Sequence, residues 1–273
     1  MTITANPETA APVSTDQAAP ATGAARLNAI VDDVQAALLG VLVKHRVTWE
    51  EYRAATGWLT TAGTQNFELP LLLDVFLSTT IDEIAHAGGE GTECNVEGPV
   101  YIPGAPILER PYVLPQRADE PGEKLVFSGT VRLTDGSPLA GAELDIWQAS
   151  ADGAYSQFHP EVPEYNLRGR LTTDADGAFS FSTVVSPPYE IPTGGSTGQL
   201  FAALGRSCYR PGHVHFKISH PDAAPLTTQL YFDHDPFLGS DVVGAVKSSL
   251  VITLERGDGT TCAYDFVLPG ATS

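Results

Sequence analysis

From about residue 94 to the C-terminus, short apolar runs alternate with polar residues and are separated by turn signals. Such alternation is typical of strands, whose successive side chains point to opposite faces. Asp-Gly pairs, which favour tight hairpin turns, occur at 135–136, 152–153, 176–177 and 258–259. The chain also contains 26 Gly and 21 Pro, a composition that suits a turn-rich β protein better than a helical bundle. We therefore predict a mainly β fold, a β-sandwich or barrel, over residues 94–273.

Residues 26–93 have a helical pattern instead. An apolar stripe with steps of three and four residues begins near Arg26 and contains Leu27, Ile30, Val31, Val34, Ala37, Leu38 and Leu42. Thr48 and Glu51 have the spacing of a capping box and predict the start of a second helix. A third helix is predicted over residues 68–85. This helical unit has apolar surface to bury, either within itself, against the next domain or against a second subunit.

Charge and composition limit the classes of partner. The formal net charge is −18, which disfavours nucleic acid and anionic membranes, and no apolar run reaches the ~20 residues of a membrane helix. Residues 1–25 are rich in Ala, Pro and Thr, lack the pattern of a signal peptide and are predicted to be a disordered tail. Three cysteines without a C-x-x-C pair suggest reduced thiols rather than a disulfide framework. We expect a cytoplasmic protein without nucleic-acid binding or membrane insertion.

The stretch "CYRPGHVHFKI", residues 208–218, carries two histidines at alternate positions. In a strand, His213, His215 and Lys217 share one face, whereas Val214, Phe216 and Ile218 share the other. Two imidazoles on one face suggest a metal site, but imidazole suits zinc, copper or iron about equally. His159 and the "DHD" at 233–235 are predicted to be loop residues rather than ligands. The residues alone therefore leave the metal, and a packing role for the histidines, open.

Four motifs resemble those of a known family when they are taken in order. They are "DGAYS" at 152–156, "PPYEIPT" at 187–193, "YRPGHVHF" at 209–216 and "TTQLYF" at 227–232. This series resembles the intradiol ring-cleaving dioxygenases, and within them the catechol 1,2-dioxygenase and chlorocatechol 1,2-dioxygenase branch. The likeness extends from the predicted helices to about Leu250, which is most of the chain. It implies a C-terminal prealbumin-like β-sandwich, residues 94–273, behind an N-terminal helical dimerisation unit, residues 26–93.

The resemblance implies one non-haem iron(III) per subunit and no organic cofactor. Carried over to this sequence, the metal ligands are Tyr155, Tyr189, His213 and His215. The chemistry agrees, because a hard cation lowers the pKa of a bound phenol. Two phenolates and one hydroxide cancel the three positive charges of the metal, so that the site can be buried at a small desolvation cost.

The implied reaction cleaves catechol with O2 between its two hydroxylated carbons and gives cis,cis-muconate. Tyr189 is expected to leave the metal and accept a proton when the substrate binds. Arg210 is expected to stabilise negative charge that develops on the ring. Gln229 matches a glutamine that orients the site. Solvent-facing or purely structural roles for Arg210 and Gln229 remain open from sequence alone.

By position, an apolar substrate wall is predicted from Leu59, Ala62, Val96, Pro99, Val100, Val242 and Val243. Such a wall suits a flat aromatic ring, although core packing is an equally good interpretation of each residue. In this branch the helices form a dimer interface, in some members with bound phospholipid, so we expect a homodimer. Departures from the family pattern are "SCY" before Arg210, Gln148 in place of a histidine, and "PPYEIPT" around Tyr189. They leave the choice among catechol, methylcatechols, chlorocatechols and hydroxyquinol open.

Two other classes remain as alternatives. A prealbumin-like sandwich also occurs in binding modules without catalytic activity, and "GTVRLTDGSPLAGAELDIW" at 129–147 would fit one. Such a module has no reason to keep two tyrosines together with the paired histidines. A zinc hydrolase is the third class, but no carboxylate base is evident beside the histidine pair.

Overall fold

The computed structural model describes residues 23–65 and 67–271. By its internal contacts the chain divides into two compact units, one ending at Gly57 and the other beginning at Trp58. The predicted domain boundary after residue 93 stays a prediction. Most of the predicted tail, residues 1–22, lies outside the described residues, and the first helix already begins at Ala24. No helix in the described part of the chain is both long and apolar enough to cross a membrane.

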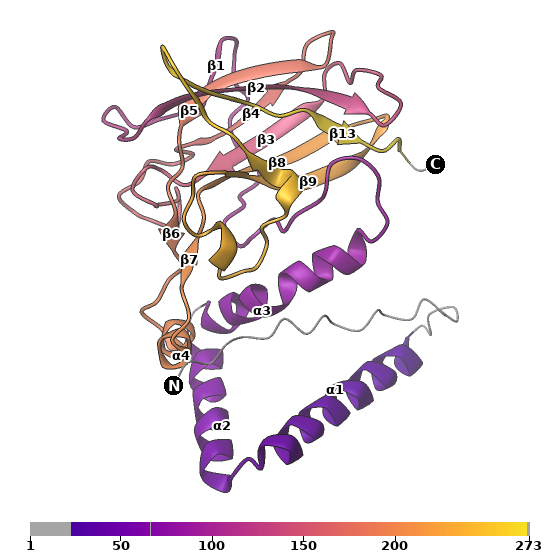
Figure 1. Ribbon diagram of the computed structural model, residues 1–273, viewed down its shortest axis with the longest axis vertical. Coiled ribbons are helices and arrows are strands. Elements are labelled where there is room, and N and C mark those ends of the chain that lie inside the picture. The colour runs from indigo at the N-terminus through magenta and orange to yellow at the C-terminus, as the bar shows by residue number, and fades with distance from the viewer. Residues whose placement is uncertain (1–22, 66, 272–273) are drawn as a thin grey trace. The chain divides into compact units, whose positions relative to one another are not determined.

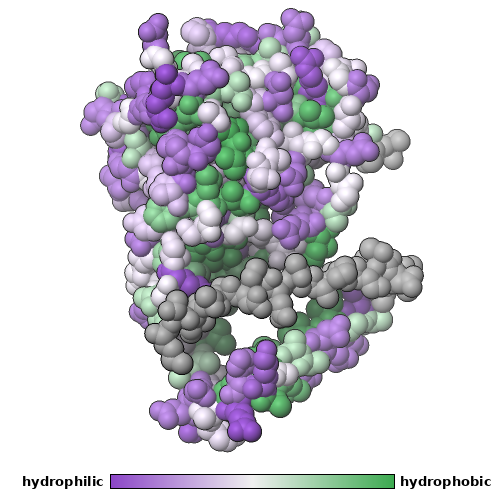
Figure 2. Space-filling view, in the orientation of Figure 1, coloured by the Kyte–Doolittle hydropathy of each residue, from purple (hydrophilic) through white to green (hydrophobic). Residues whose placement is uncertain are grey.

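The first unit contains α1 (Ala24–His45) and the start of α2 (Trp49–Thr64). The predicted capping box is confirmed: the Glu51 backbone N–H donates to Thr48 Oγ1 at 3.2 Å, and the Thr48 N–H donates to Glu51 Oε2 at 2.7 Å. None of the residues of α1 is buried. Its predicted apolar stripe is therefore exposed, and hydrophobic side chains are visible along the helix (Figure 2).

The second unit begins with the remainder of α2 and with α3 (Glu68–Ala85), whose bounds agree with the prediction, and it also contains α4 (Ser196–Leu204). The Thr197 N–H donates to Glu68 Oε2 at 2.7 Å, so the acidic start of α3 receives an N–H from the first turn of α4. A Cβ at Gly195 would lie only 1.8 Å from Glu68 Oε1, so a side chain at this position would displace the Glu68 carboxylate. Phe76 and Phe201 bring the two helices together, with ring centroids 5.7 Å apart.

Two sheets form the rest of the second unit (Figure 1). The first has the strand order β1-β5-β2-β12-β11, with β13 also paired to β2, and the second has the order β10-β9-β8-β3-β4. The strands of the first sheet are β1 (Tyr112–Val113), β2 (Lys124–Leu133), β5 (Ala178–Val184), β11 (Glu255–Arg256), β12 (Thr260–Ala263) and β13 (Phe266–Leu268). Those of the second are β3 (Glu143–Gln148), β4 (Arg168–Thr172), β8 (His213–His220), β9 (Ala223–Phe232) and β10 (Val251–Ile252). Outside both sheets, β6 (Tyr189–Glu190) pairs with β7 (Tyr209–Arg210), and η1 (Leu238–Ser240) and η2 (Ser248–Leu250) are short 3₁₀ turns.

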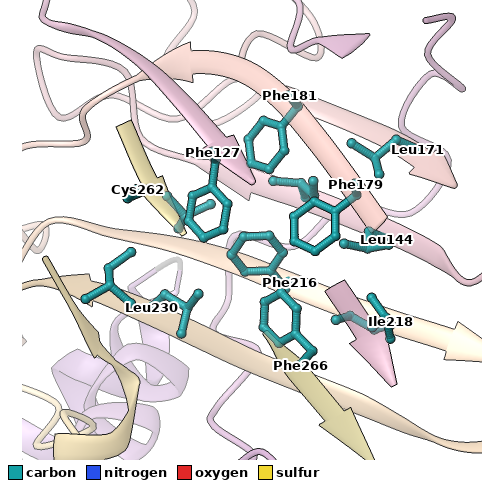
Figure 3. Close-up of a cluster of buried hydrophobic side chains, with 14 of the residues drawn as sticks. Phe127, Leu144, Leu171, Phe179, Phe181, Phe216, Ile218, Leu230, Cys262 and Phe266 are labelled. Atoms are coloured by element: carbon teal, nitrogen blue, oxygen red, sulfur yellow. The ribbon is translucent and has the colours of Figure 1, made fainter. Parts of the chain in front are cut away.

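An apolar core fills the space between the sheets (Figure 3). Phe127 of β2 stacks on Phe181 of β5 with centroids 5.3 Å apart, and it meets Phe216 of β8 at the same distance. The predicted β-sandwich with an N-terminal helical unit is therefore confirmed. The predicted faces of β8 are also confirmed, because Val214, Phe216 and Ile218 belong to this core.

The Asp-Gly pairs do not all form the hairpins that we predicted. Asp258-Gly259 connects β11 and β12, which are antiparallel neighbours. Asp176-Gly177 instead links β4 to β5, which lie in different sheets. A tight turn fixes only the local chain reversal, and the partner of each strand is chosen by the packing of the two sheets.

Candidate active site

The site lies on the face of β8 that points away from the core. His213 and His215 are fully buried, and their Nε2 atoms are 3.0 Å apart. His213 Nδ1 lies 2.7 Å from the Pro211 carbonyl oxygen, which can only accept, so Nδ1 carries the hydrogen and Nε2 presents a lone pair. Burial, followed by neighbouring positive charge, lowers the pKa of both histidines well below the usual range. Both are therefore neutral imidazoles, the form that binds metal.

Tyr155 and Tyr189 approach the histidines from two other segments. The Tyr155 N–H donates to His159 Nδ1 at 3.0 Å, which holds the chain just after the 152–153 turn. Tyr189 of β6 pairs with Arg210 of β7. The two tyrosine rings meet edge to face with centroids 5.5 Å apart, and the Tyr189 ring lies 5.7 Å from that of His213.

The turn before Tyr155 leaves little room for a side chain. Gly153 has a φ of 81°, and a Cβ there would lie 3.0 Å from the Cβ of Tyr189. Both observations favour glycine. The Asp-Gly pair in this motif thus allows the two tyrosine segments to approach each other.

Two polar atoms at this site are buried without a hydrogen-bond partner among the described residues: Tyr155 Oη and His215 Nδ1. Tyr155 is 2 % exposed, and burial, with Tyr189 as the next cause, raises the pKa of its phenol well above the ordinary value. A buried hydroxyl without a partner is destabilising. A cation at this position would remove this energetic cost, because the cation would favour ionisation of the phenol and would bind the resulting phenolate oxygen.

The donor set fits iron(III) better than zinc. Within residues 23–65 and 67–271 there is no group of three or more His, Cys, Asp or Glu side chains that could hold a metal ion. A metal beside His213 and His215 would thus depend on the phenol oxygens of Tyr155 and Tyr189. Hard anionic oxygen with imidazole suits a hard, highly charged cation. The zinc hydrolase alternative lacks its third conventional ligand in this part of the chain.

Arg210 is 5 % exposed and is held by a network of hydrogen bonds beside the histidines. Its Nε donates to Asp241 Oδ1 at 3.2 Å, and its Nη2 donates to Gln229 Oε1 at 3.0 Å. Its Nη1 lies 3.4 Å from His213 Nε2. A fixed positive charge is thus placed next to the candidate metal ligands.

Gln229 of β9 is fully buried and lies opposite His215 in the β8–β9 register, so a solvent-facing role does not apply. Its Nε2 donates to the Val96 carbonyl, and its Oε1 also accepts from the hydroxyl of Tyr231 at 2.8 Å. The amide is therefore fixed at both ends, and it fixes the guanidinium of Arg210 in turn.

A cavity of about 620 Å³ opens beside these groups and is lined by Tyr189, Arg210 and His215. Of the predicted wall, Val96, Pro99, Val100 and Val243 line it. The other three predicted residues do not line it: Leu59 is half exposed, Ala62 is buried elsewhere, and Val242 packs against a small cluster around Val75. Helix α3 and the residue that follows it, His86, supply most of the remaining wall. The α3 residues are Leu71, Leu73, Asp74, Val75, Leu77, Ser78, Ile81, Asp82 and Ala85.

Three acidic or histidine side chains around the site were not recognised from the sequence. Asp241 holds Arg210, and His159 holds the backbone of Tyr155. Asp235 was predicted to be a solvated loop residue, but it is 7 % exposed and accepts from the Gly212 N–H at 2.7 Å. Asp241 and Asp235 act through contacts between distant segments, whereas His159 acts on a backbone group four residues away. None of these contacts gives a periodic signal in a single sequence.

Comparison with known proteins agrees with this geometry. Residues 96–270 match the family model described as "Dioxygenase", and residues 24–93 match "Catechol dioxygenase N terminus". A chlorocatechol 1,2-dioxygenase of Rhodococcus opacus is 41% identical over 236 residues, 85% of this chain and 91% of the relative. Catechol 1,2-dioxygenase 2 of Acinetobacter lwoffii is 39% identical over 216 residues, 77% of this chain and 78% of the relative.

A solved structure is similar over nearly the whole chain. The crystal structure of 3-chlorocatechol 1,2-dioxygenase from Rhodococcus opacus 1CP matches with a TM-score of 0.88 and 42% identity. The match covers 91% of this chain and 100% of that one. The chain belongs to the intradiol ring-cleaving dioxygenases.

Proposed function

We propose that this protein cleaves catechol and chlorocatechols with O2 to the corresponding cis,cis-muconates. We further propose that an iron(III) ion held by Tyr155, Tyr189, His213 and His215 supports the reaction. The observation that carries the proposal is the convergence of two neutral imidazoles and two phenols, with Tyr155 Oη buried and unpartnered. When bound, the iron would accept electron density from the substrate and so make a ring carbon reactive toward O2.

The proposed ligands and the side chains around them have separate roles in the reaction. Tyr189 is only half-buried and lines the cavity, so its phenol oxygen is the proposed acceptor for a proton from a catechol hydroxyl. Tyr155, His213 and His215 are buried and stay in place. Arg210 would stabilise negative charge on the ring, and Gln229 and Asp241 hold its guanidinium in the required orientation.

The cavity favours rings with apolar substituents. Its α3 wall presents Leu71, Leu77 and Ile81, and Val100 lines it as well. Arg210, the only Arg or Lys among the described residues that line it, already bonds Asp241, Gln229 and Tyr231. Asp74 also lines the cavity and would repel a ring carboxylate. Asp82 and Glu97 line it too, but they pair with Lys247 and Lys217. Chlorine, which needs no hydrogen-bond partner, would be accepted, and two of the relatives above are named for chlorocatechol.

Product analysis tests the proposal. The iron-loaded protein should consume one O2 per ring and give muconates that carry both atoms of labelled oxygen. We expect kcat/KM for 3-chlorocatechol or 4-chlorocatechol to equal or exceed that for catechol, and no turnover of 3,4-dihydroxybenzoate. A clear preference for hydroxyquinol would contradict the apolar specificity. Cleavage outside the two hydroxylated carbons would contradict the reaction itself.

We also propose that the protein is a homodimer through its N-terminal helices, with phospholipid as a further occupant of that interface. The exposed stripe of α1 supports this, because Leu27, Val31, Val34 and Leu38 are each about half exposed or more and such patches favour association. Light scattering should give twice the monomer mass, and mass spectrometry of an organic extract should detect the lipid. A monomer at micromolar concentration would contradict the dimer.

The three free cysteines fit a reducing compartment, so we propose a cytoplasmic location, to be checked by cell fractionation.

A further inference from the structure

Arg168, the first residue of β4, is a buried cation that the proposed reaction does not use. It is 1 % exposed, yet it forms no ion pair within 4.0 Å among the described residues. Its neighbour on the same strand, Arg170, is more exposed and pairs with Glu143 at 3.6 Å. Burial of an unpaired charge is energetically unfavourable, so an anionic group beside Arg168 would stabilise it.

The partner that the geometry offers is Tyr155. The guanidinium carbon of Arg168 lies 5.8 Å from the centre of the Tyr155 ring. Within residues 23–65 and 67–271, Tyr155 Oη and Arg168 Nη1 both lack a hydrogen-bond partner. Asp145, a nearby buried carboxylate, is engaged by the hydroxyl of Tyr101 at 3.0 Å.

The local backbone also fixes Arg168 in this position. Tyr165 and Leu167, just before it, have φ values of 57° and 54°, a left-handed conformation that such residues rarely adopt. The Arg168 Nε then donates to Ser156 Oγ at 2.6 Å, and Nη2 lies 3.4 Å from the Ser156 carbonyl oxygen. Because Ser156 follows Tyr155 directly, Arg168 holds the tyrosine segment next to the phenol.

We propose that Arg168 is a positioning residue that acts through Tyr155, as the buried counter-charge of its metal-bound phenolate. This inference rests on the proposed function, since it requires Tyr155 to bind iron. The positive charge lowers the energy of the phenolate electrons. It therefore makes the phenolate a weaker electron donor and raises the energy of the tyrosinate-to-iron charge transfer.

The test is the visible spectrum of iron-loaded full-length variants. In Arg168→Gln the charge-transfer band should move to longer wavelength. Arg168→Lys keeps the charge and should keep the band near the wild-type position. Arg170→Gln, which removes a neighbouring charge of the same strand, is the matched control and should leave the band unchanged.

Ser156→Ala separates charge from anchoring, because it removes a hydrogen bond of Arg168 but not the guanidinium. Its band should stay at the wild-type position. If Arg168→Gln does not fold, the spectra of Arg168→Lys and Ser156→Ala decide the question in the same way. Equal shifts in the Lys and Gln variants, a shift in Ser156→Ala, or no shift in Arg168→Gln would overturn the inference. A wild-type protein without any charge-transfer band would instead overturn the proposed iron site.

Discussion

Strand β8 separates two interiors that are equally buried but differ in chemistry. On one face Val214, Phe216 and Ile218 contact only the apolar core between the sheets. On the other, His213 and His215 meet a buried phenol and a guanidinium, and two polar atoms there have no hydrogen-bond partner in the described part of the chain. The first face is satisfied by apolar packing, whereas the second has unused donor atoms that a bound cation would engage. The comparison indicates that the core stabilises the fold and that the opposite face of β8 carries the candidate active site.

The largest expected effect is that of Tyr155→Phe, which removes one buried oxygen. Iron affinity and turnover should fall by more than the ~10–100-fold typical of residues outside the ligand shell. The free energy of unfolding of the iron-free protein should stay the same or rise, because an unsatisfied hydroxyl disappears. Iron analysis, steady-state kinetics and denaturant unfolding measure the three quantities. A less stable iron-free variant would show that the hydroxyl has a partner in the protein.

Phe216→Ala tests the other face of the same strand. We expect it to lower the free energy of unfolding by about 3–5 kcal/mol, because a large core side chain is replaced by a cavity. Val126→Ala, at an exposed position of β2, is the control and should change it by less than about 0.5 kcal/mol. A small effect of Phe216→Ala in urea unfolding would mean that the core is not the main source of stability.

Asp241→Asn should lower the activity while the protein keeps its iron. The carboxylate accepts from Arg210 Nε and from the backbone N–H of Ala245 at 2.9 Å, so the variant loses the charge that holds the guanidinium. We expect kcat/KM for catechol to fall by about 10–100-fold while the iron content stays near one per chain. Loss of iron together with activity would mean that Asp241 supports the ligands themselves.

The smallest effect concerns Cys262, a core thiol of β12. Burial raises its pKa from about 9 to about 12, so the folded protein keeps the thiol neutral where the unfolded chain ionises it. The stabilising contribution is therefore complete below pH 9 and is lost as the pH rises toward 12. Between pH 8 and pH 10, wild type should lose about 1 kcal/mol more unfolding free energy than Cys262→Ala. Parallel pH profiles of the two proteins would contradict this.

The fold could be predicted largely because its signals are local. The alternation around His213 and His215 separated the two faces of β8 correctly, and the capping pair of Thr48 and Glu51 marked the start of α2. The prediction of a hairpin at the Asp-Gly pair 176–177 was wrong, because the turn residues do not specify which sheet the next strand joins.

The site was only partly accessible from the sequence. The resemblance supplied Tyr155 and Tyr189, which have no spacing relation to the histidines. The helical part of the cavity wall was assigned to Leu59 and Ala62 of α2, but α3 supplies it, because the choice between two amphipathic helices depends on tertiary packing. Arg168 and Asp241 gave no signal at all, since each acts through a contact across many residues.

The central claim is that His213 and His215, on the polar face of β8, bind iron(III) together with Tyr155 and Tyr189 as tyrosinates. A visible absorption spectrum tests this claim most directly. The purified, iron-loaded protein should be red-brown, with a broad charge-transfer band that moves to longer wavelength when catechol is added without oxygen. A protein that takes up no iron and stays colourless when iron is supplied would contradict the four-ligand assignment.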